Sequence, residues 1–300
     1  MSDAIRLTLR NPLTADDQPA EGVLAPMEGL DETTELKLLG LPEMKQGGRN
    51  SAIPLDTAAT PAVSDMLERI EQALEGAARS GSAWRVRLDH LSESERDTLY
   101  DALGRGEVSA IIAGGTPEEG EAQVIESVFP GVWMGQASSQ DGQDTTHWIE
   151  VGDCPRAVRE VALSRPRNDI AMEALTAPRG AMNVMAVLAE LRERSLAWKP
   201  GDENHVMNFT LFPMTPADSA FLSNVLGECG VRLTSGGYGA ARVFMTGLRH
   251  VWAVQYLNGL GAVILDTLEV GDVPSAALAS VEDFEDSAER LKQMREAYQV

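Results

Sequence analysis

Hydrophobic spacing divides the chain into helical and extended segments. Apolar residues three or four positions apart predict a helix over about 61–79, where Leu67, Ile70 and Leu74 share one face. Alternation of apolar and polar residues predicts a strand at 84–88. The same two patterns predict further helices over 92–103, 155–163 and 215–226, from about 182 to before 199, and from about 282. They predict strands at 108–113, 122–128, 132–137, 147–151, 206–212, 231–234, 241–245, 251–257 and 262–270.

Two helix starts carry the sequence signature of a capping box. Ser92 is followed three residues later by Glu95, and Thr215 is followed by Asp218. In this arrangement the hydroxyl and the acid each accept a hydrogen bond from a free backbone N–H of the first turn. A glycine then ends each helix, at 104 and at 227.

The chain contains an internal repeat. Residues 149–157 read IEVGDCPRA and residues 268–276 read LEVGDVPSA, at an offset of 119 positions that also places Trp133 on Trp252. Upstream the offset becomes 123, which places Leu103-Gly104 on Leu226-Gly227. The order of elements agrees in both halves, so the sequence predicts two tandem homologous units of α+β class, each a mostly antiparallel sheet with covering helices.

These units lie within three expected regions. Residues 1–57 are rich in Pro, Gly, Asp and Thr and predict an irregular acidic N-terminal arm. We expect the first unit with flanking helices at 58–200 and the second unit with its C-terminal helix at 201–300.

The repeated Gly-Asp-x-Pro words have a structural explanation. Glycine permits a positive φ, aspartate caps, and proline suits a first helical turn. We therefore interpret Asp153 and Asp272 as turn residues rather than as a general acid and base. A hydrolase with paired carboxylates would need both in one cleft.

Composition narrows the classes of partner. The net charge of −21 opposes binding to nucleic-acid phosphates and anionic membranes, and it would attract a basic peptide, although it also serves solubility alone. No apolar run approaches the ~20 residues that cross a bilayer, and the first residues lack a secretion signal. With two cysteines in 300 residues, we expect a cytoplasmic protein without membrane insertion.

The two copies differ most before the shared tryptophan. The first copy reads Phe129-Pro130-Gly131, whereas the second carries Arg249 and His250 after a glycine-rich stretch with Tyr238. Three interpretations remain open: a plain hairpin, a protein-contact surface, and a catalytic or phosphate site. Because arginine and aromatic residues favour protein contacts, our candidate partner-binding residues are Tyr238, Arg249, His250 and Trp252.

Metal and nucleophile signals are weak. Cys154 and Cys229 are isolated, each in an expected turn, and neither has a histidine at ligand spacing. We therefore predict no catalytic residue, no metal site and no cofactor. A metal or iron–sulfur carrier that uses these cysteines, and an enzyme with its site between the repeats, remain as alternatives.

The stretch GYGAARVFMTGLRHVWAVQYLN at 237–258 and the tail EDFEDSAERL at 282–291 resemble the HupH, HyaF and HoxQ family of hydrogenase expression/formation proteins. The likeness covers roughly 60–298. It implies a maturation chaperone, not an enzyme, for a membrane-bound uptake [NiFe]-hydrogenase. The implied partner is the iron–sulfur small-subunit precursor before twin-arginine export, together with other maturation factors. Whether the chain forms a homodimer is left open.

Overall fold

The computed structural model describes residues 60–113, 120–138, 145–209, 214–236 and 240–298. Its strands form one antiparallel sheet in the order β1-β5-β4-β3-β2-β7-β8-β9-β10-β6. The strands are β1 (Trp84–Arg87), β2 (Val108–Ile112), β3 (Ala122–Glu126), β4 (Val132–Ser138), β5 (Thr145–Val151), β6 (His205–Asn208), β7 (Glu228–Ser235), β8 (Ala241–Thr246), β9 (Val251–Leu257) and β10 (Val263–Val270). The helices are α2 (Pro61–Ser80), α3 (Glu93–Leu103), α4 (Arg156–Ser164), α5 (Val184–Ala197), α6 (Pro216–Leu226) and α7 (Val281–Tyr298), with short 3-10 turns η1 (Met172–Ala174) and η2 (Ser275–Ala277).

The predicted duplication is confirmed by the order of the strands. Strands β1–β5 form one half of the sheet and β6–β10 form the other, with the halves in mirrored order about the β2–β7 pair. In that pair Ala110 lies opposite Leu233, its own counterpart in the repeat. Val108 lies opposite Ser235 and Ile112 opposite Val231, so the pairing is symmetric about this point. A local twofold axis therefore runs through the sheet at the junction of the units.

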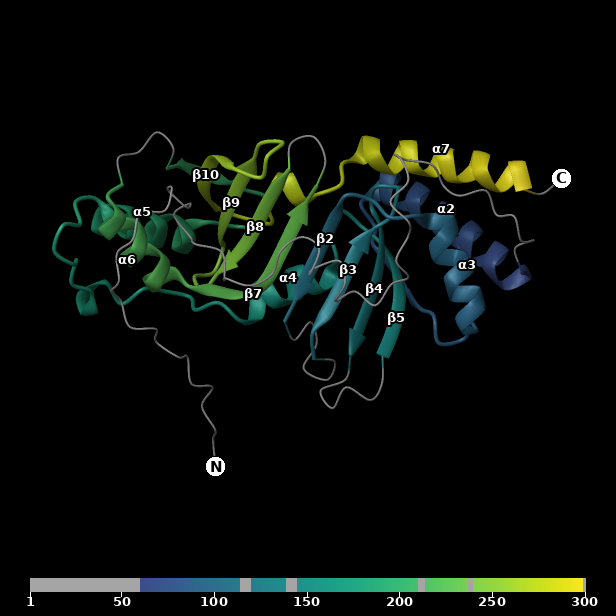
Figure 1. The fold of residues 1–300 in the computed structure, drawn as a ribbon, viewed down its shortest axis with the longest axis horizontal. Coiled ribbons are helices and arrows are strands. Elements are labelled where there is room, and N and C mark those ends of the chain that lie inside the picture. Colours follow the sequence, from purple (N-terminus) through teal and green to yellow (C-terminus); the bar gives the residue numbers. More distant parts are fainter. Residues whose placement is uncertain (1–59, 114–119, 139–144, 210–213, 237–239, 299–300) are drawn as a thin grey trace, which may run out of the picture.

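Helices cover both faces of the sheet, and they do so differently. On one face, α2, α3 and α7 pack on the first unit, and α5 and α6 pack on the second. Figure 1 shows these two groups at opposite ends of the molecule, with the sheet between them. On the other face, α4 and η2 lie over the central strands of both units, around Trp133, Leu233 and Trp252. This central cluster joins the units into one core.

Both predicted capping boxes are present. Ser92 with Glu95 caps α3, and Thr215 with Asp218 caps α6. Asp218 does more than its counterpart, because its Oδ1 also accepts from the backbone N–H groups of the residues that open α5, at 2.8 Å from Met182, 3.0 Å from Asn183 and 2.9 Å from Val184. One buried carboxylate thus holds the first turns of two helices.

The segment that follows each unit packs on the other unit. After α4, Arg167 N donates to Gly247 O at 2.9 Å, and Arg249 N donates to Arg167 O at 2.9 Å. After η2, Ala279 N donates to Asp153 O at 2.8 Å, and the ring of Phe284 in α7 fills the space beside Gly131. The two tails are exchanged between the halves of the molecule.

Several sequence-based expectations need adjustment. The sequence predicts a turn at Cys229, but it is the second residue of β7, at a point where the β7–β8 register shifts. The arm at 1–57 and Tyr238 lie outside the described residues. The boundary at residue 200 stays a prediction; since α5 packs with α6 and β10, we propose that the second unit begins with α5. Within the described residues, no helix combines the length and apolar character needed to span a membrane.

Candidate functional site

The turn between β8 and β9 has an unusual backbone. His250 has φ of 62°, and among the described residues it is the one non-glycine with a positive φ. Its counterpart in the first unit is Gly131, with φ of 83°. For a residue with a side chain, this left-handed conformation costs about 1 kcal/mol. It persists only where surrounding contacts hold the backbone in place. Such positions are often found at ligand-binding sites.

Contacts on both sides hold His250 in this conformation. Its carbonyl accepts from Gly271 N at 2.7 Å, and its imidazole lies against the Trp198 indole with ring centroids 4.5 Å apart. Ser195 Oγ donates to the preceding carbonyl, of Arg249, at 2.6 Å. The last turn of α5 therefore fixes the β8–β9 turn.

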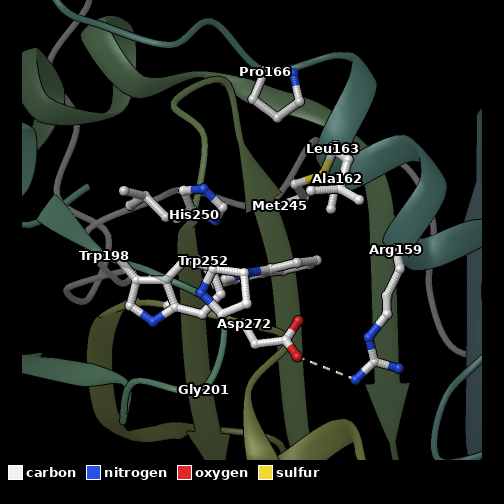
Figure 2. A pocket seen from close by; sticks show the side chains of 13 residues that line it. Arg159, Ala162, Leu163, Pro166, Trp198, Gly201, Met245, His250, Trp252 and Asp272 are labelled. Atoms are coloured by element: carbon white, nitrogen blue, oxygen red, sulfur yellow. Dashed lines mark hydrogen bonds and ion pairs between the residues drawn. The ribbon is translucent and has the colours of Figure 1, made fainter. Parts of the chain in front are cut away.

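His250 borders a pocket of about 390 Å³. Figure 2 shows Trp198 and His250 on one side, Arg159 and Asp272 on another, and Trp252 between them. The walls come from α4, the connector after it, the segment after α5, the β8–β9 turn and the segment after β10. The lining residues are Arg159, Ala162, Leu163, Pro166, Trp198, Pro200, Gly201, Met245, His250, Val251, Trp252, Gly271 and Asp272.

An ion-pair cluster closes one side of the pocket. Arg159 donates to both oxygens of Asp153, at 2.7 and 3.0 Å, and to Asp272 Oδ2 at 3.3 Å. The two repeated turns therefore converge on one arginine of α4. This supports the interpretation of both aspartates as structural residues. The cluster holds two negative charges and one positive charge, so the side formed by Asp272 is net negative.

The titratable groups nearby are shifted by their surroundings. Burial and the neighbouring Arg249 guanidinium lower the pKa of His250, with Asp272 opposing them, so the neutral imidazole is favoured. Burial raises the pKa of the Cys154 thiol to about 12, although Arg159 Nη1 lies 2.9 Å from its sulfur and opposes the shift. Burial also raises the pKa of Cys229. Neither thiol is favoured as a thiolate, the form that binds metals and attacks carbon.

The structure brings together two of the four predicted contact residues. His250 and the buried Trp252 line the pocket. Arg249 instead turns toward α4, where its Nη2 donates to Leu163 O at 2.7 Å, and its buried Nε has no hydrogen-bond partner among the described residues. Tyr238 lies outside the described residues, so its role stays a prediction.

Sequence reasoning missed most of the remaining wall. Trp198 stands at the end of an expected helix, and Leu163 and Met245 read as ordinary apolar positions. The repeated Gly-Asp-x-Pro word identifies Asp272 only as a turn residue. A tryptophan beside a Lys-Pro-Gly turn was the one usable signal, because a large aromatic residue needs a surface to pack on.

The metal-carrier alternative finds no preformed site in the described residues, where no three His, Cys, Asp or Glu side chains lie in an arrangement that could hold a metal ion. As for an enzyme between the repeats, the pocket does lie between α4 of the first unit and the sheet of the second. Its one lining carboxylate, Asp272, is ion-paired to Arg159.

The comparison with known proteins identifies the family. The sequence model described as "HupH hydrogenase expression protein, C-terminal conserved region" matches the chain twice, at 60–171 and 181–298. The chain belongs to this family. Each match spans one structural unit, and the second begins just before α5.

Known proteins are similar to this chain over most of its length. The hydrogenase expression/formation protein HupH of Rhizobium leguminosarum is 44% identical over 69% of this chain and 71% of its own length. HoxQ of Cupriavidus necator is 38% identical over 80% and 83%. The hydrogenase-1 operon protein HyaF of Escherichia coli is 30% identical over 79% and 81%.

A solved structure is also similar. The hydrogenase expression protein HupH from Thiobacillus denitrificans is 26% identical, and the match covers 37% of this chain and 92% of that chain with a TM-score of 0.35.

Proposed function

We propose that this protein is a cytoplasmic, non-catalytic factor in the assembly of a membrane-bound uptake [NiFe]-hydrogenase. It binds the iron–sulfur small-subunit precursor before that subunit is exported through the twin-arginine pathway. The observation that carries the proposal is the double match to a family whose relatives are named hydrogenase expression/formation proteins.

The pocket beside His250 is the surface that we assign to this binding. Its lining is mostly apolar and aromatic, and such residues dominate protein contacts. Leu163 at its edge is 59% exposed. Apolar side chains left in water beside an aromatic pocket favour a protein partner.

The chemistry of the pocket supports binding more than catalysis. A general acid or base needs a free titratable group, and a nucleophile needs an activating neighbour. Asp272 is held by Arg159, Cys154 is buried with a raised pKa, and the His250 ring packs against Trp198. We therefore propose stoichiometric binding, with the client released unchanged in its covalent structure.

A co-purification experiment tests the proposal. The tagged chain is mixed with the small-subunit precursor, with and without its leader, at low and moderate ionic strength. We expect retention of the precursor, strongest at low salt, because the net charge of −21 favours a basic segment. Failure to retain either form at low salt would contradict the proposal.

Two variants locate the contact. Trp198→Ala removes one side of the pocket and should weaken retention about tenfold or more, since aromatic anchors carry much of the energy of an interface. Leu196→Ala removes an exposed apolar side chain of α5 that does not line the pocket, and it should leave retention within about twofold. Equal losses in both variants would show that the pocket is not the contact.

A further inference from the structure

The pocket combines flat aromatic surfaces with one incompletely used carboxylate. Trp198 and His250 supply the accessible rings, Trp252 lies buried beneath them, and Asp272 supplies the charge. Aromatic faces attract cations because the ring quadrupole is negative above the plane. A carboxylate at the edge of such rings adds an ion pair. Together these are the groups that recognise an organic cation.

Asp272 retains capacity for a further donor. Its Oδ1 accepts from Val273 N at 2.8 Å and its Oδ2 accepts from Arg159. A carboxylate offers about four acceptor sites, so two remain. The Asp272 side chain is 52% exposed, which leaves it reachable from the pocket and from solvent.

The cations beside the pocket do not compete. Arg249 does not line the pocket, and its Nη2 donates to Leu163 O at 2.7 Å. Arg159 donates to Asp153, to Asp272 and to the Cys154 sulfur, so its guanidinium is occupied. The cluster of Arg159, Asp153 and Asp272 carries a net charge of −1. A neutral His250 ring adds no repulsion. An incoming positive charge therefore meets a negative side of the pocket.

We propose that this pocket holds a single arginine side chain from an extended segment of the partner, stacked on the aromatic rings and paired with Asp272. Arginine fits better than lysine because its planar guanidinium stacks on rings and donates along its edge. The volume of about 390 Å³ admits one such side chain with its stem against Leu163 and Met245. The identity of the partner rests on the proposed function, whereas the chemistry of the occupant does not.

A pair of peptides tests this inference. Each has nine residues of glycine, serine and alanine, with arginine at the centre of one and citrulline, its uncharged isostere, in the other. Binding is followed by NMR titration of the indole N–H signals of the full chain. We expect the arginine peptide to bind about tenfold more tightly, with the difference reduced by salt. Equal affinity for the two peptides would overturn the proposal.

Charge variants identify the group responsible. Asp272→Asn keeps the shape and should abolish the preference for arginine over citrulline. Glu160→Gln removes an exposed carboxylate from α4 that pairs with Arg156 outside the pocket, and it should keep the preference. Trp198→Ala should weaken both peptides. A preference that survives Asp272→Asn would overturn the assignment, and thermal unfolding of each variant checks that its fold is intact.

The same variants separate the two proposals. If Asp272→Asn retains the small-subunit precursor as well as the wild type does, the arginine pocket is wrong as the client contact and the assembly role stands. If the peptides behave as expected and no precursor is retained, the assembly role is wrong and the arginine site stands.

Discussion

His250 occupies a backbone position that its counterpart fills with glycine. In the first unit a Cβ at Gly131 would lie 2.3 Å from Phe284 Cε1, so that copy has no room for a side chain. In the second unit α7 is absent from this place, and the imidazole stands beside Trp198 instead. The two copies thus share the left-handed backbone at this position, and only the second carries a side chain there, which forms one wall of the pocket.

Two substitutions at this position measure the strain. His250→Ala and His250→Gly both remove the ring, but only glycine tolerates φ of 62° without cost. We expect the glycine variant to be more stable than the alanine variant by about 1 kcal/mol in denaturant unfolding. Equal stabilities, or a more stable alanine variant, would show that the backbone at residue 250 is not strained.

Glu126 gives the fold a pH dependence. It is 7% exposed on β3, and burial raises its pKa to about 7; Asp283 adds to the shift, while a hydrogen bond from Gly131 N opposes it. The folded chain therefore binds this proton up to higher pH than the unfolded chain does. The stabilisation is complete below the unfolded pKa of about 4.5 and is lost as pH rises through about 7.

Glu126→Gln should remove this dependence. The amide oxygen can still accept from Gly131 N, and no buried charge forms at high pH. We expect the variant to be more stable than the wild type at pH 8, by on the order of 2 kcal/mol, and nearly equal at pH 5. Glu285→Gln, an exposed change of the same charge on α7, is the control for net charge. A constant difference across this pH range would argue against Glu126 as the titrating group.

At the scale of elements, the two units share a capping box at a helix start, but the acid of the box makes more hydrogen bonds in the second unit. Glu95 accepts from Ser92 and from the Thr60 hydroxyl at the start of α2, on an exposed surface. Asp218 is fully buried and accepts from the starts of α5 and α6 together. Burial opposes its ionisation, but hydrogen bonds from Thr215, Val184 and Asn183 outweigh that effect and lower its pKa well below the usual range.

Asp218→Ala should therefore be among the more damaging single changes. It leaves the first turns of two helices without their acceptor, which should cost about 2–4 kcal/mol in the free energy of unfolding. Because its folded pKa is lowered, the wild-type advantage should shrink as pH falls below about 4. Glu95→Ala is the matched change in the first unit, and its loss should be clearly smaller. A comparable loss of stability in the two variants would show that Asp218 does not stabilise the start of α5.

Much of the fold was predictable at this scale, and the reasons are physical. Period-two alternation in Trp84–Arg87 and helical spacing in α2 depend only on which faces meet the core, and both appear in the sequence. Each capping box depends on residues only three positions apart in the sequence, so both could be predicted equally well. The pocket was not, because Trp198, Asp272 and Leu163 come together only when α4 crosses to the second unit. The sequence gives one sign of the strained backbone at His250: the aligned residue of the first unit is Gly131.

At the scale of the whole molecule, the exchanged tails couple the two halves. α7 follows the second unit but buries Phe284 and Leu291 in the core of the first. The segment after α4 follows the first unit but places Ile170 in the core of the second. Each core is therefore incomplete without residues that belong to the other unit by sequence.

This arrangement predicts a single cooperative unfolding transition. Phe284→Ala opens a cavity beside Gly131 and should lower the stability of the whole chain by about 3–5 kcal/mol. Differential scanning calorimetry should show one transition that moves as a unit. Leu260→Ala changes a side chain that is 93% exposed, and it should leave the temperature of this transition unchanged. Two resolved transitions, of which only one moves, would contradict the coupling.

The symmetric pairing of β2 with β7 also has a consequence for the history of the gene. An ancestor with one unit would have joined its central strand to the same strand of a second molecule, with each tail laid across its neighbour. Fusion of two such genes would make that assembly independent of concentration and would free each copy to change without the other. One copy could then keep glycine in its turn, while the other acquired histidine and a new surface.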